Sequence, residues 1–380
     1  MDTLARLKSL SSQMHLEPAE DAGCPKLDTP EWPAGMVVKA VLPNGGRTGL
    51  LKTLLTSACE RNCFYCPFRA GRNYRRVTLK PEEMARSFMD LYQARVAGGL
   101  FLSSGIVAGG VKSQDKLITT AEILRYKYGY RGYLHLKIMP GAEFAQVERA
   151  MQLADRVSVN LEAPNTPRLL KLAPRKEFME ELLTPLRWVE QIRSSQPAHR
   201  SWNGRWSSSV TQFVVGAVGE SDLELLSTTE QLYQEYRLRR AYFSAFRPIE
   251  DTPLENLPPA SKMREFRLYQ ASFLMRDYGF SMEEMPFDPE GFLPENVDPK
   301  LAWAQNHLFE RPVEINQANK QELLRIPGIG PKGATSILRA RRDGSLKGVD
   351  DLRRIGVNPD RALPFILLDG RQPSRQLALF

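Results

Sequence analysis

The chain has few cysteines and no long apolar run. Only four of its 380 residues are cysteine, too few and too unevenly spaced for a disulfide-stabilised scaffold. No segment approaches the roughly 18 uncharged apolar residues that a membrane-spanning helix needs. The first sixteen residues include Asp2 and lack the continuous apolar stretch of a secretion signal. We therefore expect a cytoplasmic protein without a membrane partner.

Excess positive charge is scarce in most of the chain and concentrated at one end. The net charge is +8, yet residues 311–380 hold 13 Lys and Arg against 7 Asp and Glu, while residues 1–310 hold 39 against 37. Five prolines between residues 286 and 312 lie close to this change in net charge along the chain. The chain also exceeds one domain of roughly 100–200 residues. We predict an N-terminal extension over residues 1–45, a near-neutral body over residues 46–310 and a basic appendage over residues 311–380.

The body alternates short apolar, β-branched runs with longer amphipathic stretches. The expected strands are Leu50–Thr56, Leu100–Ser103, Tyr133–Met139, Val157–Leu161, Thr211–Gly216 and Ala241–Phe246. The expected helices between them include Pro81–Ala97, Thr119–Tyr128 and Asp222–Tyr236. This alternation predicts an α/β fold with parallel strands, forming a twisted sheet or a partial or complete barrel. Chemistry in such folds gathers at the carboxyl ends of the strands.

Three cysteines lie close together directly after the first expected strand. The segment Cys59-Glu-Arg-Asn-Cys63-Phe-Tyr-Cys66 lets three thiolates converge on one small metal centre. Three protein ligands leave one coordination position open, whereas four would close a structural zinc site. The alternative is zinc with a distant fourth ligand, either Cys24 or a histidine. Cys24 lies in a segment flanked by Pro and Gly, and we expect it to be a thiol that binds no metal.

This cysteine pattern, with an aromatic residue just before the last cysteine, resembles the radical S-adenosylmethionine (SAM) superfamily. There, three cysteines hold a [4Fe-4S] cluster, and the amino and carboxylate groups of SAM chelate its fourth iron. One electron then cleaves SAM to methionine and a 5′-deoxyadenosyl radical, which abstracts hydrogen from a substrate. The resemblance implies that Cys59, Cys63 and Cys66 are the cluster ligands and the catalytic centre, with SAM as the second cofactor. It also implies a partial (β/α)6 TIM-like barrel and a one-electron donor such as flavodoxin or ferredoxin.

Small and polar residues at later strand ends match positions where this superfamily binds SAM. The implied cofactor contacts are Tyr65, Ser103, Ser104, Gly105, Lys137, Ser158, Asn160, Glu162 and Gly216. The Ser-Ser-Gly turn departs from the common Gly-Gly-Glu, which leaves the amine contact of SAM undefined. Residues 158, 160 and 162 share one face because side chains alternate along a strand. The alternatives are a solvated Lys137 and an ordinary turn at Gly216.

The basic appendage contains a helix, a tight Pro-Gly-Ile-Gly turn and a second helix. Free amides at the start of that second helix, beside Lys332, make a phosphate site. The pattern resembles the helix-hairpin-helix module, which implies a small all-α domain with nucleic-acid contacts at Gly328, Gly330 and Lys332. A weaker second copy follows, with helices expected at Val349–Arg354 and Pro359–Leu367. The alternative is a packing or protein-interaction domain.

Other basic and aromatic residues in the body fit a polyanionic partner. Arg72, Arg75 and Arg76 crowd the loop after the cysteines and could capture phosphate, although a solvated loop explains them equally well. In the Ser- and Arg-rich segment 194–209, Trp202 and Trp206 could stack on an unpaired base. We prefer the alternative that these tryptophans pack back onto the barrel.

Over almost its whole length the chain resembles a bacterial family of radical SAM proteins associated with DNA modification or repair. Members are thought to work beside a uracil-DNA-glycosylase-like protein. We therefore predict an enzyme that cleaves SAM reductively and acts on nucleic acid, with DNA as the first choice. One alternative is a radical SAM enzyme that modifies RNA, such as a tRNA base. Another is a non-catalytic, metal-stabilised scaffold that binds DNA.

Overall fold

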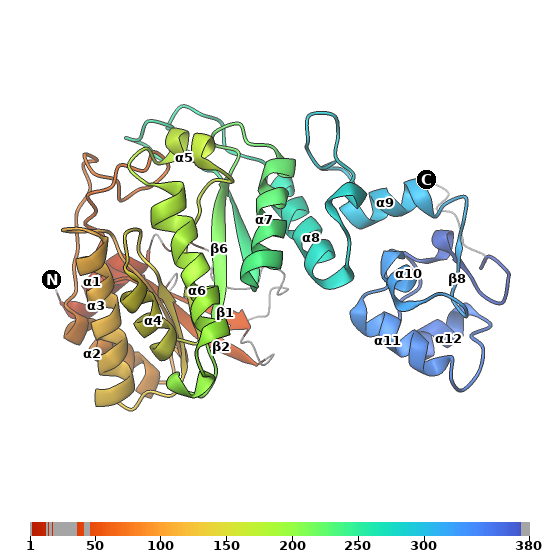
Figure 1. Cartoon of the computed structure of the whole chain (residues 1–380), viewed down its shortest axis with the longest axis horizontal. Coiled ribbons are helices and arrows are strands. Elements are labelled where there is room, and N and C mark those ends of the chain that lie inside the picture. Colours follow the sequence, from red (N-terminus) through yellow and green to blue (C-terminus); the bar gives the residue numbers. More distant parts are fainter. Residues whose placement is uncertain (1, 13, 15–16, 18–35, 42–45, 374–380) are drawn as a thin grey trace. The chain divides into compact units, whose positions relative to one another are not determined.

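The structure of the chain is a computed structural model that describes residues 2–12, 14, 17, 36–41 and 46–373. The chain divides into two compact units (Figure 1). One comprises Met1–Glu220 and Gln231–Ser261, and the other comprises Ser221–Glu230 and Lys262–Phe380. No helix among the described residues is long and apolar enough to cross a membrane.

A seven-stranded sheet, ordered as in the chain, forms the first unit. Its strands are β1 (Val37–Val41), β2 (Arg47–Leu54), β3 (Gly99–Ser103), β4 (Tyr133–Lys137), β5 (Arg156–Ser158), β6 (Ser208–Val215) and β7 (Arg240–Ala245). The β1–β2 pair is antiparallel, and every later pair is parallel. Strands β2 to β7 confirm the six predicted strands, with ends that differ by at most three residues. The predicted N-terminal extension adds β1 at the edge of β2.

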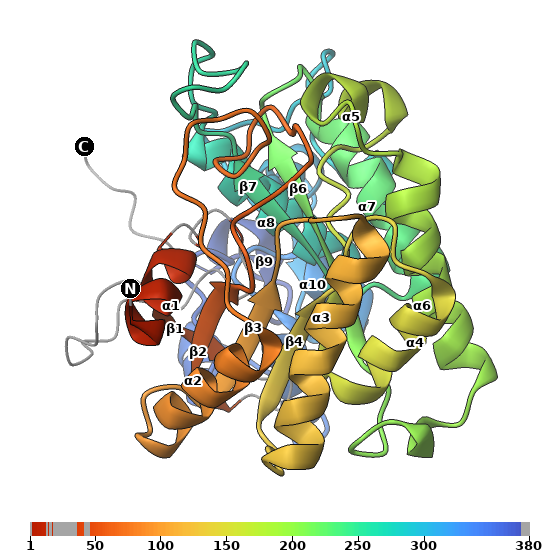
Figure 2. The ribbon, with the colours of Figure 1, turned by 90° about the vertical axis from the view of Figure 1, so that its left-hand side faces the viewer.

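Helices cover the outer face of this curled sheet (Figure 2). They are α1 (Thr3–Ser11), α2 (Pro81–Gln93), α3 (Gly110–Glu122) with a π-helical turn at Ile123–Lys127, α4 (Phe144–Leu153), α5 (Thr166–Leu172), a π-helical segment at Phe178–Leu183, α6 (Thr184–Ser195), a 3-10 turn at Ala198–Arg200 and the second part of α7 (Asp222–Tyr236). Helix α2 shows why these segments are helical. Pro81 fits its first turn, and the Glu83 carboxylate accepts a 2.8 Å hydrogen bond from the Lys80 amide.

Polar residues line one face of the sheet interior. Strand register places Phe101 beside His135 and His135 beside Arg156, and it places Lys137 beside Ser158. Side chains alternate along each strand, so both rows lie on the same face. All five residues are buried. Burial of charged and polar side chains is costly unless they find partners, and this face therefore differs from an ordinary apolar barrel core.

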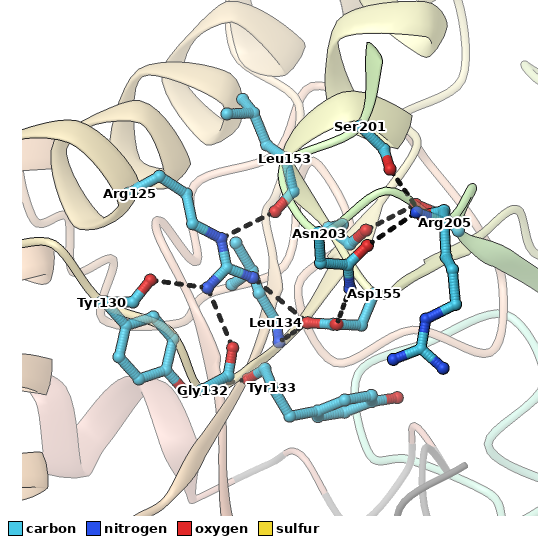
Figure 3. Close-up of polar contacts among 12 residues, drawn as sticks. Arg125, Tyr130, Gly132, Tyr133, Leu134, Leu153, Asp155, Ser201, Asn203 and Arg205 are labelled. Atoms are coloured by element: carbon cyan, nitrogen blue, oxygen red, sulfur yellow. Dashed lines mark hydrogen bonds and ion pairs between the residues drawn. The ribbon is translucent and has the colours of Figure 1, made fainter. Parts of the chain in front are cut away.

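A buried arginine ties the amino ends of the strands together (Figure 3). The Arg125 guanidinium donates to the carbonyls of Leu153, Tyr130 and Gly132 at 2.8–2.9 Å and pairs with Asp155 at 3.1 Å. The Trp202 ring lies over the guanidinium, 3.7 Å from ring centroid to Cζ. The amino ends of the parallel strands lie at the opposite edge of the sheet from their carboxyl ends, where the cysteine loop begins. Trp202 therefore packs against the barrel, as our preferred interpretation had it.

The second unit is mostly helical. Besides the first part of α7, it contains α8 (Lys262–Tyr278), a 3-10 turn at Met282–Glu284, α9 (Pro299–His307), β8 (Val313–Glu314), α10 (Lys320–Arg325), α11 (Pro331–Ala340), α12 (Val349–Arg354), a 3-10 turn at Leu363–Phe365 and β9 (Ile366–Leu367). Its apolar cluster includes Leu323, Ile326, Ile329, Ala334, Ile337, Leu352 and Phe365. Helix α10, the turn through Gly328 and helix α11 follow the predicted order.

Two expectations for the second unit were wrong. The segment Pro359–Leu367 is no continuous helix, because it forms a 3-10 turn and then β9. Strand β9 pairs parallel with β8, so the unit is not all-α. Burial of Ile366 and Phe365 in the apolar cluster explains why tertiary packing overrode the helical pattern.

Candidate functional site

Three thiols line one pocket at the carboxyl end of the sheet. Cys59, Cys63 and Cys66 lie in the loop after β2, and none of the three forms a disulfide. The pocket opens to solvent, and about 1140 Å³ of non-atom space, open solvent included, lies within its bounds. Among the described residues, no group of three or more His, Cys, Asp and Glu is arranged to hold a single metal ion. Cys24 lies outside the described residues.

The cysteine loop is held in shape by its own arginine. The Arg76 guanidinium donates to the carbonyls of Ser57, Phe68, Arg69 and Arg72 at 2.7–3.3 Å. Four hydrogen bonds from one side chain to four carbonyls fix the path of the backbone around the thiols. Arg76 is thus committed to the loop itself, which disfavours the predicted role for it in phosphate capture.

The two neighbouring arginines have different surroundings. Arg72 donates to the carbonyls of Glu250 and Pro67 at 2.9 and 3.0 Å, so it also bonds to the protein's own backbone. Arg75 is exposed. Of the three predicted phosphate contacts in this loop, Arg75 is the one whose side chain faces solvent.

The turn after β3 packs directly on the cysteine loop. The Ile106 amide lies 3.5 Å from Cys59 Sγ, and the Gly105 amide donates to the Thr56 carbonyl at 2.8 Å. A Cβ added at Gly105 would lie 2.1 Å from the Ala58 carbonyl oxygen, so only glycine permits this approach. Ser103 and Ser104 line the same pocket. The small-residue turn thus positions one of the thiols, in addition to any contact with a ligand.

A buried ion pair lies beside the thiols. Lys176, which the sequence analysis did not single out, pairs with Glu162 at 2.9 Å. Both line the pocket together with Tyr65. Glu162 has a left-handed backbone (φ +67°), an uncommon conformation for a residue with a side chain. Strained residues of this kind cluster at functional sites.

Burial and charge act in opposite directions on these groups. Burial raises the pKa of the Cys63 and Cys66 thiols, and the Lys176 ammonium opposes that rise. Burial alone would raise the pKa of Glu162, but Lys176 and Lys137 outweigh it and hold that pKa low. The site therefore keeps Glu162 ionised, whereas its thiols need an additional positive charge to ionise.

A second ion pair lies deeper in the pocket. Lys137 pairs with Glu17, a residue of the predicted N-terminal extension, and Asn160 Nδ2 lies 3.4 Å from the same carboxylate. Asn160 also donates to Gln212 at 3.3 Å. Glu17 and Gln212 line the pocket but carried no signal in the sequence analysis. Gln212 could have been found from its alternation along β6, whereas nothing in the sequence links Glu17 to the strands.

Two predicted cofactor contacts lie outside this pocket. Ser158 lies in a smaller cavity beneath it. Gly216 forms the turn after β6 with φ +90°, and its amide donates to Glu220. Tyr65, Ser103, Ser104, Gly105, Lys137, Asn160 and Glu162 are brought together with the three cysteines.

The predicted phosphate-binding turn has the expected residues at its surface. Gly328 adopts φ +85°, and Gly330 is the N-cap of α11. Gly328 and Lys332 are exposed. Beneath the turn, the Lys300 ammonium donates to the Ile329 carbonyl at 2.6 Å. Trp206 has its Nε1 bonded to the Gln196 carbonyl at 3.0 Å in the first unit, so its polar edge is already satisfied.

Comparison with known proteins gives only distant structural likenesses. No protein-family model and no curated protein matches the chain. Among solved structures, the [FeFe]-hydrogenase maturase HydG from Carboxydothermus hydrogenoformans aligns with 60% of this chain and 51% of its own, at 16% identity and TM-score 0.46. Methylornithine synthase PylB aligns with 60% of this chain and 62% of its own, at 14% identity and TM-score 0.47.

A third solved structure is the radical S-adenosylmethionine methyltransferase TsrM from Kitasatospora setae. It aligns with 58% of this chain and 39% of its own, at 15% identity and TM-score 0.40. The chain thus covers less than two thirds of each of these three structures. At such identities and TM-scores, we draw the function from the residues of this chain.

The residues of the pocket suit an iron–sulfur cluster and a polar ligand. Three buried or half-buried thiols, one facing a backbone amide, form the donor set that a [4Fe-4S] cluster takes, and the cluster iron supplies the positive charge that they need. The buried Glu162 carboxylate pairs with Lys176 and also interacts with the Tyr65 hydroxyl. Such an acceptor suits a hydroxyl group of a ligand.

Proposed function

We propose that the chain is a radical SAM enzyme that acts on nucleic acid, with DNA as the first choice. The observation that carries the enzymatic part is the convergence of Cys59, Cys63 and Cys66 with a polar pocket at the carboxyl ends of the parallel strands. When bound, the cluster and SAM supply a 5′-deoxyadenosyl radical by one-electron cleavage of a sulfonium bond.

The residues of the chain then have distinct tasks. The three cysteines hold the cluster, and the turn at Gly105 fixes the position of Cys59. Glu162 offers its carboxylate to a ligand hydroxyl, while Lys176 keeps that carboxylate ionised. The apolar wall of the pocket, which includes Ile138, Val159 and Phe246, limits the access of water.

The choice of nucleic acid rests on the second unit. The exposed turn through Gly328, the N-terminus of α11 and Lys332 offer backbone amides and a cation to a phosphate group. The sequence carries its excess positive charge in residues 311–380. A one-electron donor such as flavodoxin or ferredoxin, and a uracil-DNA-glycosylase-like protein, are the partners that belong to this proposal.

Anaerobic reconstitution with iron and sulfide tests the enzymatic part. We expect about four irons per chain, a brown colour, and release of 5′-deoxyadenosine from SAM on addition of dithionite. The variant C63A should fold, as judged by circular dichroism, and lack both properties. A colourless zinc protein that leaves SAM intact would contradict the proposal. Loss of folding in C63A would favour a metal-stabilised scaffold.

Binding measurements test the substrate class. Affinities for single-stranded DNA, duplex DNA and tRNA should be compared at several salt concentrations, because affinity without its salt dependence is uninterpretable. Tighter binding to DNA supports the proposal. Preferential binding to tRNA would favour the RNA-modifying alternative, and no binding to either would remove nucleic acid as the substrate.

A further inference from the structure

Two opposite charges lie beside the thiols, and their effects on the thiols do not cancel. The Lys176 and Glu162 side chains, 2.9 Å apart, are only 9% and 5% exposed. Burial raises the pKa of the Cys63 thiol, and Lys176 opposes that rise more strongly than Glu162 adds to it. Burial also raises the pKa of Cys66, and Lys176 again opposes the rise. The thiols are therefore closer in effect to the positive member of the pair.

Backbone contacts fix Lys176 next to the cysteine loop. Lys176 lies in the segment that follows α5. Before it, the Leu172 carbonyl accepts a 2.8 Å hydrogen bond from the Phe64 amide of the cysteine loop. Directly beside it, the Arg175 carbonyl accepts a hydrogen bond from the Arg61 guanidinium of the same loop. Because the loop and this segment are bonded at two places, the ammonium has a defined position relative to the thiols.

The Glu162 carboxylate is held equally firmly. Its amide donates to the Gln212 carbonyl at 2.9 Å, and its carbonyl accepts from the Val214 amide at 2.8 Å, both on β6. The Tyr65 hydroxyl, from the cysteine loop, interacts with the same carboxylate. The ion pair is thus a fixed arrangement of charge between the sheet and the cysteine loop.

A fixed charge beside an iron–sulfur cluster affects how easily the cluster is reduced. Reduction brings one electron from the donor and adds one negative charge to the site, while no bond forms or breaks. Cluster potentials depend on nearby charge, on hydrogen bonds to sulfur and on solvent exposure. A cation stabilises the added negative charge, and it acts more strongly when it is buried, because water and salt screen it less.

We propose that Lys176 raises the reduction potential of the cluster that the three cysteines hold, and that Glu162 limits this rise. The ammonium thereby makes the cluster easier to reduce by a one-electron donor, while the carboxylate keeps the buried cation compensated. The proposal rests on the cluster of the proposed function, but on neither SAM nor the nucleic acid substrate.

Redox titration of the reconstituted full-length protein without SAM, followed by electron paramagnetic resonance, tests this role. In K176M we expect the ratio of reduced to oxidised cluster at a given potential to fall about tenfold, equivalent to about 59 mV for one electron. K176R keeps the charge and should remain near the unmodified chain. The exposed Lys171 on α5 supplies the matched control, since K171M should leave the potential unchanged. Equal potentials in K176M and K171M would overturn the proposal.

The carboxylate provides a test in the opposite direction. E162Q leaves the ammonium without its counter-charge, so the potential should rise. The double variant K176M/E162Q holds neither buried charge and should fold even if a single variant does not. Because the ammonium dominates at the thiols, the double variant should have a lower potential than the unmodified chain. A potential equal to or above that of the unmodified chain would show that Lys176 has no such role.

Iron content separates this proposal from the proposed function. Each variant should bind about four irons per folded chain, as the unmodified protein should. A cluster that forms and cleaves SAM, but whose potential ignores residue 176, would contradict this proposal alone. A cluster whose potential follows Lys176 without cleavage of SAM would contradict the proposed function alone. A protein that binds no iron would contradict both.

Discussion

At the residue scale, Lys176 decides whether the buried Glu162 carboxylate is tolerated. The ammonium pairs with it at 2.9 Å, and both side chains are largely buried. Removing one partner of a buried pair leaves an uncompensated charge and costs about 3–5 kcal/mol. We therefore expect K176M to lower the free energy of unfolding by that amount in urea denaturation.

The control for this prediction lies on α5. Lys171 is exposed, so K171M should leave the free energy of unfolding nearly unchanged. The double variant K176M/E162Q should recover much of the loss, because no charge then remains buried. Equal destabilisation by K171M and K176M would mean that the ion pair contributes nothing specific.

Residue patterns predicted the cysteines and the small-residue turn of the site, but not the charged residues that pair beside them. The cysteines and the Ser103–Gly105 turn were predictable because local spacing and small size carry the signal. Lys176 and Glu17 were not, because each reaches the pocket through tertiary packing from a segment without a motif. Ser158 was predicted with Asn160 and Glu162 from strand alternation, yet it lies deeper along the strand, in the lower cavity.

At the scale of elements, the amino ends of β4 and β5 depend on Arg125. Its guanidinium makes four polar contacts that a lysine cannot reproduce together. We expect R125K to lower the free energy of unfolding by about 3 kcal/mol, since bonds to charged groups are worth about 1.5–3 kcal/mol each. Arg131 is exposed, and R131K serves as the control.

Because Arg125 lies at the opposite end of the strands from the thiols, R125K should bind iron normally once folded. Iron content per folded chain, measured at a temperature where the variant is stable, checks this separation. A variant that is fully stable but poor in iron would show that the two ends of the sheet are coupled.

The contact between α9 and the turn before α11 makes the stability of the second unit depend on pH. Burial lowers the pKa of Lys300 to about 7, with Asp298 opposing and Arg361 and Arg325 adding to the decrease. Between about pH 7 and pH 10 the unfolded lysine binds a proton that the folded one has lost. The free energy of unfolding therefore rises with pH in this window, by at most about 1.4 kcal/mol per pH unit. Below about pH 7, Lys300 no longer makes the free energy of unfolding depend on pH.

The variant K300M tests that pH dependence. Urea unfolding at pH 7.5, 8.5 and 9.5 should show stability that rises in the unmodified chain and changes less in K300M. The exposed Lys320 supplies the control, since K320M should follow the unmodified chain. Equal slopes in K300M and in the unmodified chain would mean that Lys300 keeps its charge in the folded state.

At the scale of the whole molecule, the uneven charge of the sequence predicts how nucleic acid is held. Binding through residues 311–380 should weaken steeply with salt, because each neutralised phosphate releases counterions. We expect K332E to reduce affinity for all sequences alike and to lower the magnitude of the log–log salt slope by about one or two. A loss confined to particular base sequences would contradict backbone recognition.

The overall plan of the chain was predictable to different degrees in its two parts. Alternating strands and helices predicted the order of β2 to β7, because parallel strands with helical crossovers leave few topologies. The β8–β9 pair escaped prediction, since two-residue strands carry no periodicity. Its partners lie some fifty residues apart in sequence, too far for a local pattern to pair them.

The hydrogen bonds of Arg76 have a consequence for the maturation of the protein. Because one guanidinium binds four carbonyls of the cysteine loop, we expect these hydrogen bonds to hold the loop in shape without iron. The cluster is then assembled in a loop that is already folded, and the chain does not have to fold around the metal. The iron-free protein should accordingly be stable, and it should bind and release iron repeatedly without unfolding. The supply of iron should then limit the rate of maturation.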